Sequence, residues 1–162
     1  MKNMLAVLND KSAGVFSVGT KDSVLDALKL MAEYHIGSVL VMENWTLQCI
    51  ATERDYARKV VLLGKLSSTT PIIDIMTQPV ITVLPTDTVS HCMAVMNEHK
   101  IRHLPVLDGE HVLGLISIGD LVKAVIEHQQ LEIKQLQSYI SGWVWLLKHE
   151  IADGYKMASA SS

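Results

Sequence analysis

The chain repeats itself once, at an offset of 65 residues. Residues 15–61 align over residues 80–126 without a gap, and the alignment pairs Asp55 with Asp120. A two-fold repeat of this kind predicts two copies of one supersecondary unit that bury their faces against each other.

Each copy has the pattern of a strand, a helix, two strands and a helix. In the first copy, a short strand at residues 15–18 precedes Asp22, which stands where a helix N-cap belongs. Apolar residues at helical spacing follow, and then the continuous apolar run 38–42, which is typical of a buried strand. The last helix spans 54–63 and ends at Gly64, because glycine favours the position just past a helix.

The second copy repeats this pattern. Its strands are predicted at 80–83, 103–107 and 112–116, and Asp87 takes the N-cap position. Pro105 removes one hydrogen-bond donor from the middle strand, so that strand is expected to lie at an edge or to be irregular there.

The segment between the copies contains a further helix signal. Thr70 and Pro71 predict a helix start with proline at the first position, and Pro79 ends this short helix. The chain is therefore predicted to be an α/β (α+β) protein with two tandem domains packed with pseudo-two-fold symmetry. The predicted boundaries are 1–66 for the first domain with an N-terminal helix, 67–130 for the second with the linker helix, and 131–162 for a C-terminal helix and tail.

Composition narrows the function classes. Of the 162 residues, 49% are hydrophobic and 19% charged, which is enough for a sizeable core. The net charge of -3 argues against a nucleic-acid partner. Apolar runs fall far short of the roughly 18 residues that span a bilayer, and the N-terminus lacks a signal-peptide pattern. We therefore expect a cytoplasmic protein with no membrane partner.

The cysteines and histidines do not suggest a metal or redox centre. Cys49 and Cys92 have no CxxC spacing, so two reduced and buried thiols are expected. The seven histidines are scattered without the spacing of a zinc site.

A hydroxyl residue followed three positions later by an aspartate opens the last helix of each copy, as Thr52 with Asp55 and as Ser117 with Asp120. This pattern is a capping box, which needs no ligand. It also suits a nucleotide, because the N–H groups of a helix N-terminus bind anions and a carboxylate accepts hydrogen bonds from a ribose diol. The repetition favours a ligand role beside the capping role. In the first copy, three cations lie on the first turns of the helix: Arg54, Arg58 and Lys59.

Several stretches together resemble cystathionine-β-synthase (CBS) domains paired as a Bateman module. They are IGSVLVM, TERDYARK, DIMTQPVITV, RHLPVLDG and GLISIGDLVKAV, and the resemblance covers residues 15–128. It is closest to stand-alone bacterial CBS-pair proteins, whose C-terminal helix ends in a pattern similar to YISG at 139–142. The resemblance implies a regulatory module that binds adenine nucleotides such as AMP, ATP or NAD in clefts between the halves. It also implies dimers, often arranged as a disc.

The resemblance also implies the site residues of two clefts, each built from the turn of one copy and the backbone of the other. The first cleft would comprise Thr52, Arg54 and Asp55, facing Val80, Ile81, Ile101, Arg102 and His103. The second would comprise Ser117, Ile118, Gly119 and Asp120, facing Phe16, Ile36, Gly37 and Ser38. For Val80, Ile81, Ile36 and Phe16, a plain core role of the side chain is the alternative.

Two departures from the family pattern stand out. The family usually has Gly-Ile-Val before TERD, whereas this chain has Cys49-Ile50-Ala51, which affects how closely the backbone approaches a ligand. After Gly142, residues 143–162 match nothing in the family, and 143–147 form an apolar patch. Three interpretations of this tail stay open: a dimer contact, a docking surface for a partner, or a disordered vector-derived extension.

The two clefts are predicted to differ in charge. The 65-residue offset places Arg54, Arg102 and His103 in the first cleft and Gly119, Gly37 and Ser38 at the matching positions of the second. Cations favour phosphate, so the first cleft should prefer AMP over adenosine and the second should discriminate less. The alternative is that Arg54 and Arg102 merely pair with Glu53 and other surface acids.

The leading hypothesis is a non-catalytic sensor of adenine nucleotides that forms a homodimer and acts on a regulated protein of unknown identity. The sequence contains no Ser/His/Asp, Cys/His or metal constellation and no P-loop or Rossmann glycine pattern, so no catalytic cofactor is expected. The alternative is a structural or partner-binding adaptor with vestigial nucleotide clefts.

Overall fold

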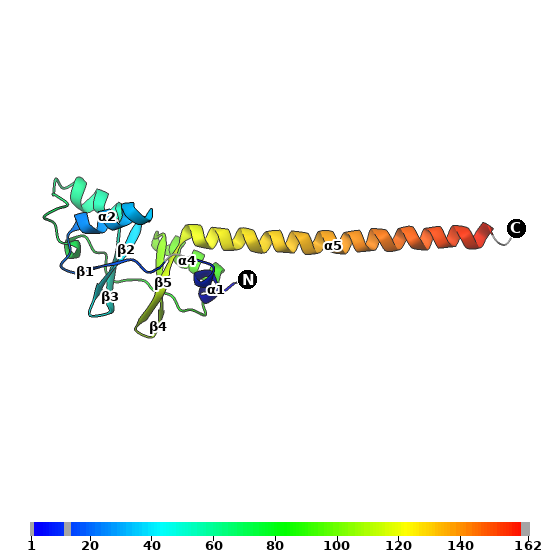
Figure 1. Ribbon diagram of the computed structural model, residues 1–162, viewed down its shortest axis with the longest axis horizontal. Coiled ribbons are helices and arrows are strands. Elements are labelled where there is room, and N and C mark those ends of the chain that lie inside the picture. Colours follow the sequence, from blue (N-terminus) through cyan, green and yellow to red (C-terminus); the bar gives the residue numbers. More distant parts are fainter. Residues whose placement is uncertain (1, 12–13, 160–162) are drawn as a thin grey trace. The chain divides into compact units, whose positions relative to one another are not determined.

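The computed structural model describes residues 2–11 and 14–159 (Figure 1). The chain divides into two compact units, Met1–Val122 and Lys123–Ser162. The first unit holds both copies of the repeat up to the start of the last helix. The second unit consists of the remainder of that helix and the C-terminal residues.

The first copy forms a three-stranded sheet with the order β1-β2-β3, in which β1 is parallel and β3 antiparallel to β2. The predicted buried strand at 38–42 is confirmed, because its first four residues are buried. The elements of this copy are β1 (Ser17–Gly19), α2 (Val24–Tyr34), β2 (Ser38–Glu43), β3 (Thr46–Thr52), α3 (Glu53–Tyr56) and the π-helix η1 (Ala57–Val61).

The second copy has a two-stranded antiparallel sheet of β4 and β5. The turn between these strands contains Gly109 at a φ of 60°, which glycine adopts without strain. The elements of this copy are α4 (Val89–His99), β4 (His103–Asp108), β5 (His111–Ser117) and α5 (Ile118–Ser159).

The strand predicted at 80–83 does not form, which corrects the sequence analysis. Only Val83 bridges to Val106 of β4. In the first copy, the Leu40 N–H donates to the Phe16 carbonyl and helps to hold β1 in the sheet. Pro105 stands at the position of Leu40 and has no N–H to donate, so this hydrogen bond cannot form in the second copy.

The helix N-caps lie one residue later than predicted. Ser23 and Thr88, rather than Asp22 and Asp87, cap α2 and α4. The two aspartates instead tighten the turn before the cap, since Asp22 Oδ2 accepts from the Gly19 N–H at 2.6 Å. Asp87 Oδ2 accepts from the Leu84 N–H at 2.7 Å.

Two other predicted helix boundaries are wrong in detail. The linker helix η2 is a single 3₁₀ turn, Ile72–Asp74, with Pro71 before it in extended conformation rather than in the first helical turn. The Thr70 hydroxyl donates to the Leu66 carbonyl at 2.8 Å and so does not cap this turn. The last helix of the first copy ends at Val61, and Gly64 follows it at a φ of 64°.

The segment that precedes each copy packs on the other copy. In α1 (Met4–Asn9), the Met4 N–H donates to the Asp87 carbonyl at 2.9 Å. The linker mirrors this contact, because the Ile72 N–H donates to the Asp22 carbonyl at 2.8 Å. The boundaries predicted at 66 and 130 stay a prediction, but the N-terminal helix has these backbone contacts with the second copy.

The core of the first copy lies between α2, η1 and the sheet, with η2 closing it. Both cysteines are free and buried, as predicted. Burial raises the pKa of the Cys49 thiol to about 12 and that of Cys92 to about 11. Both thiols are therefore protonated and weakly reactive at neutral pH.

The last helix, α5, runs without interruption for 42 residues, so the predicted second helix at 131 is a continuation of the first (Figure 1). Most of the tail at 143–162 is helical up to Ser159, and residues 160–162 lie outside the described part. Within the described residues, no helix combines the length and apolarity needed to cross a membrane.

Candidate functional site

The turn before α3 forms the predicted capping box. The Thr52 hydroxyl accepts from the Asp55 N–H at 3.1 Å. Asp55 Oδ2 accepts in return from the Thr52 hydroxyl at 2.7 Å and from the Thr52 N–H at 3.1 Å. One carboxylate oxygen is thus used to begin the helix, and the other is left for contacts outside the turn.

The second oxygen of Asp55 faces the segment that leads into the second copy. Oδ1 accepts from the Thr77 hydroxyl at 3.1 Å and lies 3.3 Å from the Lys59 ammonium. Lys59 also donates to the Ile75 carbonyl at 2.7 Å and to the Met76 carbonyl at 3.2 Å. This cation holds the linker against the helix and does not line the cleft.

The first cleft, with a volume of about 690 Å³, opens beside this turn. All eight residues predicted for it line the cavity. The Arg54 guanidinium reaches across and donates to the Lys100 carbonyl at 3.3 Å. The other lining residues are Gly37, Ile50, Glu53, Arg58, Thr77, Gln78, Pro79, His99 and Lys100.

The alternative prediction paired Arg54 and Arg102 with Glu53 and other surface acids. Within residues 2–11 and 14–159, neither Arg54 nor Arg102 forms an ion pair with a carboxylate. Both side chains are exposed at the mouth of the first cleft. They are therefore available to an anionic ligand.

The turn before α5 repeats the capping box. The Ser117 hydroxyl accepts from the Asp120 N–H at 3.2 Å. Asp120 Oδ2 accepts from the Ser117 N–H and hydroxyl, both at 2.8 Å. Oδ1 accepts no hydrogen bond from the described residues, in contrast to Oδ1 of Asp55.

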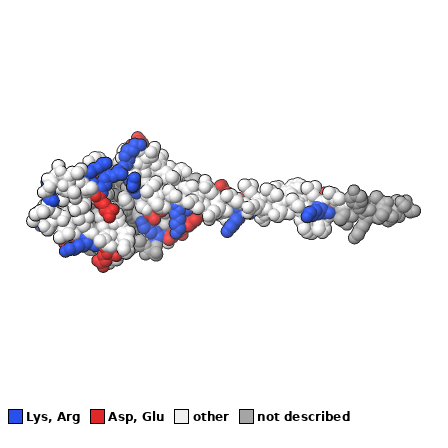
Figure 2. All heavy atoms as spheres, turned by 90° about the horizontal axis from the view of Figure 1, so that it is seen from above, with Lys and Arg blue, Asp and Glu red and all other residues white. Residues whose placement is uncertain are grey.

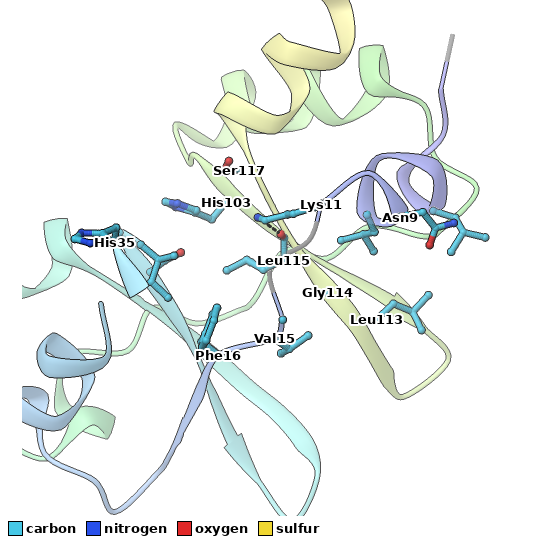
Figure 3. Close-up of a pocket in the computed structure, with 16 residues that line it drawn as sticks. Asn9, Lys11, Val15, Phe16, His35, His103, Leu113, Gly114, Leu115 and Ser117 are labelled. Atoms are coloured by element: carbon cyan, nitrogen blue, oxygen red, sulfur yellow. Dashed lines mark hydrogen bonds between the residues drawn. The ribbon is translucent and has the colours of Figure 1, made fainter. Parts of the chain in front are cut away.

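Lys11 lies in the second cleft, where the sequence analysis expected no cation. Its ammonium donates to Asp120 Oδ2 at 2.9 Å. It also donates to the Leu115 carbonyl at 3.0 Å (Figure 3). Burial alone would raise the pKa of Asp120, but hydrogen bonds from Ser117 and Lys11 outweigh it and lower that pKa below its usual value. The prediction that this cleft lacks cations is therefore wrong.

The second cleft has a volume of about 550 Å³. Of its predicted residues, Phe16, Ile36, Gly37, Ser38 and Ser117 line it, whereas Ile118, Gly119 and Asp120 do not. Asp120 reaches the cleft through Lys11, a lining residue with which it is paired. The remaining lining comes from α1 and from both copies: Leu5, Leu8, Asn9, Lys11, Gly14, Val15, His35, His103, Leu113, Gly114 and Leu115.

Two residues line both clefts, namely Gly37 and His103. His103 was predicted for the first cleft only, and Figure 3 shows it among the residues of the second. Burial lowers the pKa of His103, and the Lys11 and Arg102 charges lower it further against the opposing effect of Asp120. His103 is therefore neutral at physiological pH and can accept or donate a hydrogen bond.

The repeat itself contains the signal that would have revealed the missed residues. Thr77 and Gln78 lie in the segment that precedes the strand-like residues of the second copy. Subtracting 65 residues leads to positions 12 and 13, directly after Lys11. The segment before the second copy thus closes the first cleft with Thr77, which contacts Asp55. The segment before the first copy closes the second cleft with Lys11, which contacts Asp120.

Nucleotide chemistry fits this arrangement. A carboxylate beside a helix N-terminus can accept from two ribose hydroxyls, and the arginines of the first cleft can meet phosphate oxygens. Apolar residues such as Ile101 and Phe16 can cover a base. Within the described residues, no group of three or more metal-ligating side chains gathers.

Comparison with known proteins gives consistent results. The CBS domain model matches residues 11–62 and 72–127. A CBS-domain protein of Burkholderia ambifaria MC40-6 is 48% identical with a TM-score of 0.76, covering 79% of this chain and 96% of its own. PAE2072 of Pyrobaculum aerophilum, solved in complex with AMP, shares the fold at 23% identity and a TM-score of 0.65, covering 73% of this chain and 88% of its own.

A relative from Arabidopsis thaliana, the mitochondrial CBS domain-containing protein CBSX3, is 40% identical over 128 residues, or 76% of this chain. The match spans 62% of the length of that protein. The two matched segments, the two copies of the repeat and the shared fold agree. This chain belongs to the CBS-domain family, with two tandem CBS domains.

Proposed function

We propose that this chain is a non-catalytic sensor that binds adenine nucleotides in the two clefts between its CBS domains. The observation that carries the proposal is the pair of hydroxyl–aspartate turns, each set beside a cavity of several hundred Å³ with a cation near the carboxylate. The AMP complex of PAE2072, which has the same fold, supports an adenine nucleotide as the ligand class.

The ligand role must be separated from the capping role, and α2 offers a matched control. Ser23 and Asp26 form the same capping box, with the Asp26 N–H donating to the Ser23 hydroxyl at 3.1 Å. Neither residue lines a cleft. An Asp26→Ala variant therefore loses a helix cap without touching a candidate ligand site.

The test is isothermal titration calorimetry with AMP. Loss of a hydrogen bond to a charged group costs about 1.5–3 kcal/mol, so Asp55→Ala and Asp120→Ala should each weaken AMP binding at their cleft by roughly ten- to a hundred-fold. Asp26→Ala should bind AMP as the wild type does. If both cleft variants bind AMP unchanged, the sensor hypothesis is wrong and the partner-binding adaptor takes its place.

The functional unit we propose is a homodimer. The end of the first-copy helix and the segment after it expose four large apolar residues, between 53% and 77% accessible: Val61, Leu62, Leu63 and Leu66. Several exposed large apolar residues within one short segment are typical of a protein interface. A regulated protein of unknown identity would respond to the nucleotide-bound dimer.

The cytoplasm is the location that we propose. The net charge of -3 and the expectation of no nucleic-acid partner agree with a small-molecule sensor. Reduced, buried cysteines are also compatible with a reducing compartment.

A further inference from the structure

The second unit, from Lys123 onward, exposes apolar residues along its whole described length. Six of them are between 49% and 62% accessible: Ile126, Ile133, Leu136, Ile140, Trp143 and Leu147. Residues 135–147 of this helix contain no charged side chain. Figure 2 accordingly shows a surface of α5 that is mostly uncharged.

These residues follow a seven-residue repeat. Ile126, Ile133, Ile140 and Leu147 are each seven positions apart. Gln129, Leu136 and Trp143 follow the first three of them by three positions. An apolar residue every 3.5 positions on average forms one seam along a helix, which is the pattern of a coiled coil.

We propose that this seam pairs with the same helix of a second copy of the chain, as a parallel, in-register, two-stranded coiled coil from Ile126 to Leu147. The pairing is independent of the nucleotide function proposed above. The seam covers three heptads plus one residue, which is about the length at which a heptad pattern indicates a coiled coil. Glu150, at the next seam position, ends it because two copies would place like charges together.

The residue types of the seam favour two parallel strands. Ile133 and Leu136 have isoleucine at the first seam position of a heptad and leucine at the fourth, which is the combination of parallel dimers, and isoleucine also takes the first position of the heptads on either side. Gln129 is the single polar residue of the seam. In register, its amide can bond to the amide of the partner's Gln129, whereas an antiparallel partner would bury it against an aliphatic side chain.

The flanks of the seam permit self-association. Of the six flanking positions between Ile126 and Leu147, only Glu132 is charged. A parallel second copy would set a glutamine opposite it, at position 137, so no like charges meet. Because the face complements itself, a second copy of this chain is favoured over a different protein or a lipid surface.

Cysteine cross-linking of the full chain tests the pairing and its direction. With Gln129→Cys, parallel strands bring the two new thiols within disulfide reach. An antiparallel pair centred on the seam would separate them by 15 residues, or about 22 Å along the axis. Leu131→Cys is the matched control, because Leu131 is 55% accessible on the same helix but lies off the seam. The native thiols are buried and contribute little background.

We expect mild oxidation to give a covalent dimer with Gln129→Cys and little with Leu131→Cys. The pair Ile133→Lys and Ile140→Lys, added to Gln129→Cys, should abolish the dimer. The pair Leu131→Lys and Trp145→Lys removes equally exposed apolar residues off the seam and should leave it intact.

Three outcomes would overturn the proposal. The first is the absence of a cross-link at Gln129→Cys. The second is a cross-link that survives the seam lysines or that forms equally well at position 131. The third is flotation of the wild-type protein with anionic phospholipid vesicles that is lost in both lysine-pair variants. That result would mean that the helix lies on lipid.

Discussion

At the scale of single residues, one carboxylate does two jobs in each copy. Asp55 and Asp120 each use Oδ2 to begin a helix. Each carboxylate also meets a residue from the segment before the opposite copy, through Oδ1 of Asp55 with Thr77 and through the same Oδ2 of Asp120 with Lys11. The sequence could predict both turns, because the turn chemistry is local, and the family resemblance implied eight of the residues that line the first cleft. Lys11 was missed because it lies before the aligned part of the repeat, and its contact with Asp120 spans 109 residues.

The cations of the two clefts give a prediction about phosphate recognition. Arg54→Gln should reduce the preference for AMP over adenosine in the first cleft, and Lys11→Gln should do so in the second, each by about ten-fold. The original expectation of weak discrimination in the second cleft is revised because Lys11 lies there. Titrations with AMP and adenosine at two salt concentrations measure this, and an unchanged ratio and salt dependence would exclude the cation as a phosphate ligand.

His103 gives a prediction about pH. Its pKa is lowered in the fold, so between that value and the usual 6.5 the unfolded chain binds a proton that the folded chain does not. Stability should therefore fall as the pH drops below about 6.5. The free energy of unfolding, measured in urea at about pH 7.5 and about pH 5.5, should decrease less in His103→Gln than in wild type.

The control for this pH experiment is His111→Gln, since His111 is exposed on the β5 hairpin. That variant should keep the wild-type pH dependence. Equal pH dependence in His103→Gln and wild type would remove His103 as the cause. Lys11 and Arg102 oppose the protonation of His103 and Asp120 favours it, so a variant of any of these three would shift the effect.

At the scale of elements, apolar runs were predicted well and hydrogen-bond partners were not. The strand at 38–42 is recognised from its apolar residues alone. The strand at 80–83 fails although its residues resemble those of β1, because it depends on a donor that Pro105 lacks. The missing N–H of Pro105 was visible in the sequence, but it belongs to the neighbouring strand, β4.

The contact between α1 and β5 gives a prediction about packing. A side chain at Gly114 requires Leu8 to move, because a Cβ there would lie 2.5 Å from Leu8 Cδ2. Gly114→Val should destabilise the protein by about 1–3 kcal/mol, as overpacking does. In a Leu8→Ala background the cost should largely vanish, and urea denaturation of the two single variants and the double variant measures the coupling. Additive effects would contradict the contact.

At the scale of the whole molecule, the proposed dimer sets the mass in solution. The chain has a mass of 17.9 kDa, so light scattering at micromolar concentration should give about twice that value. The apolar residues at 61–66 and the seam of α5 are two separate surfaces for this association. A single-chain mass at that concentration would refute the dimer.

Because α1 precedes the first copy but packs on the second, it constrains the order in which parts of the chain can fold during synthesis. The carbonyl that α1 binds belongs to Asp87, more than 80 residues after Met4, and Gly114 comes later still. At about 5–20 residues per second, the ribosome takes roughly 4–17 s to add those residues. For that interval the first helix has been made but its docking surface has not. The linker η2 can dock at once, since the first copy is already complete when it emerges. The second cleft is therefore the last part of this molecule that translation can close.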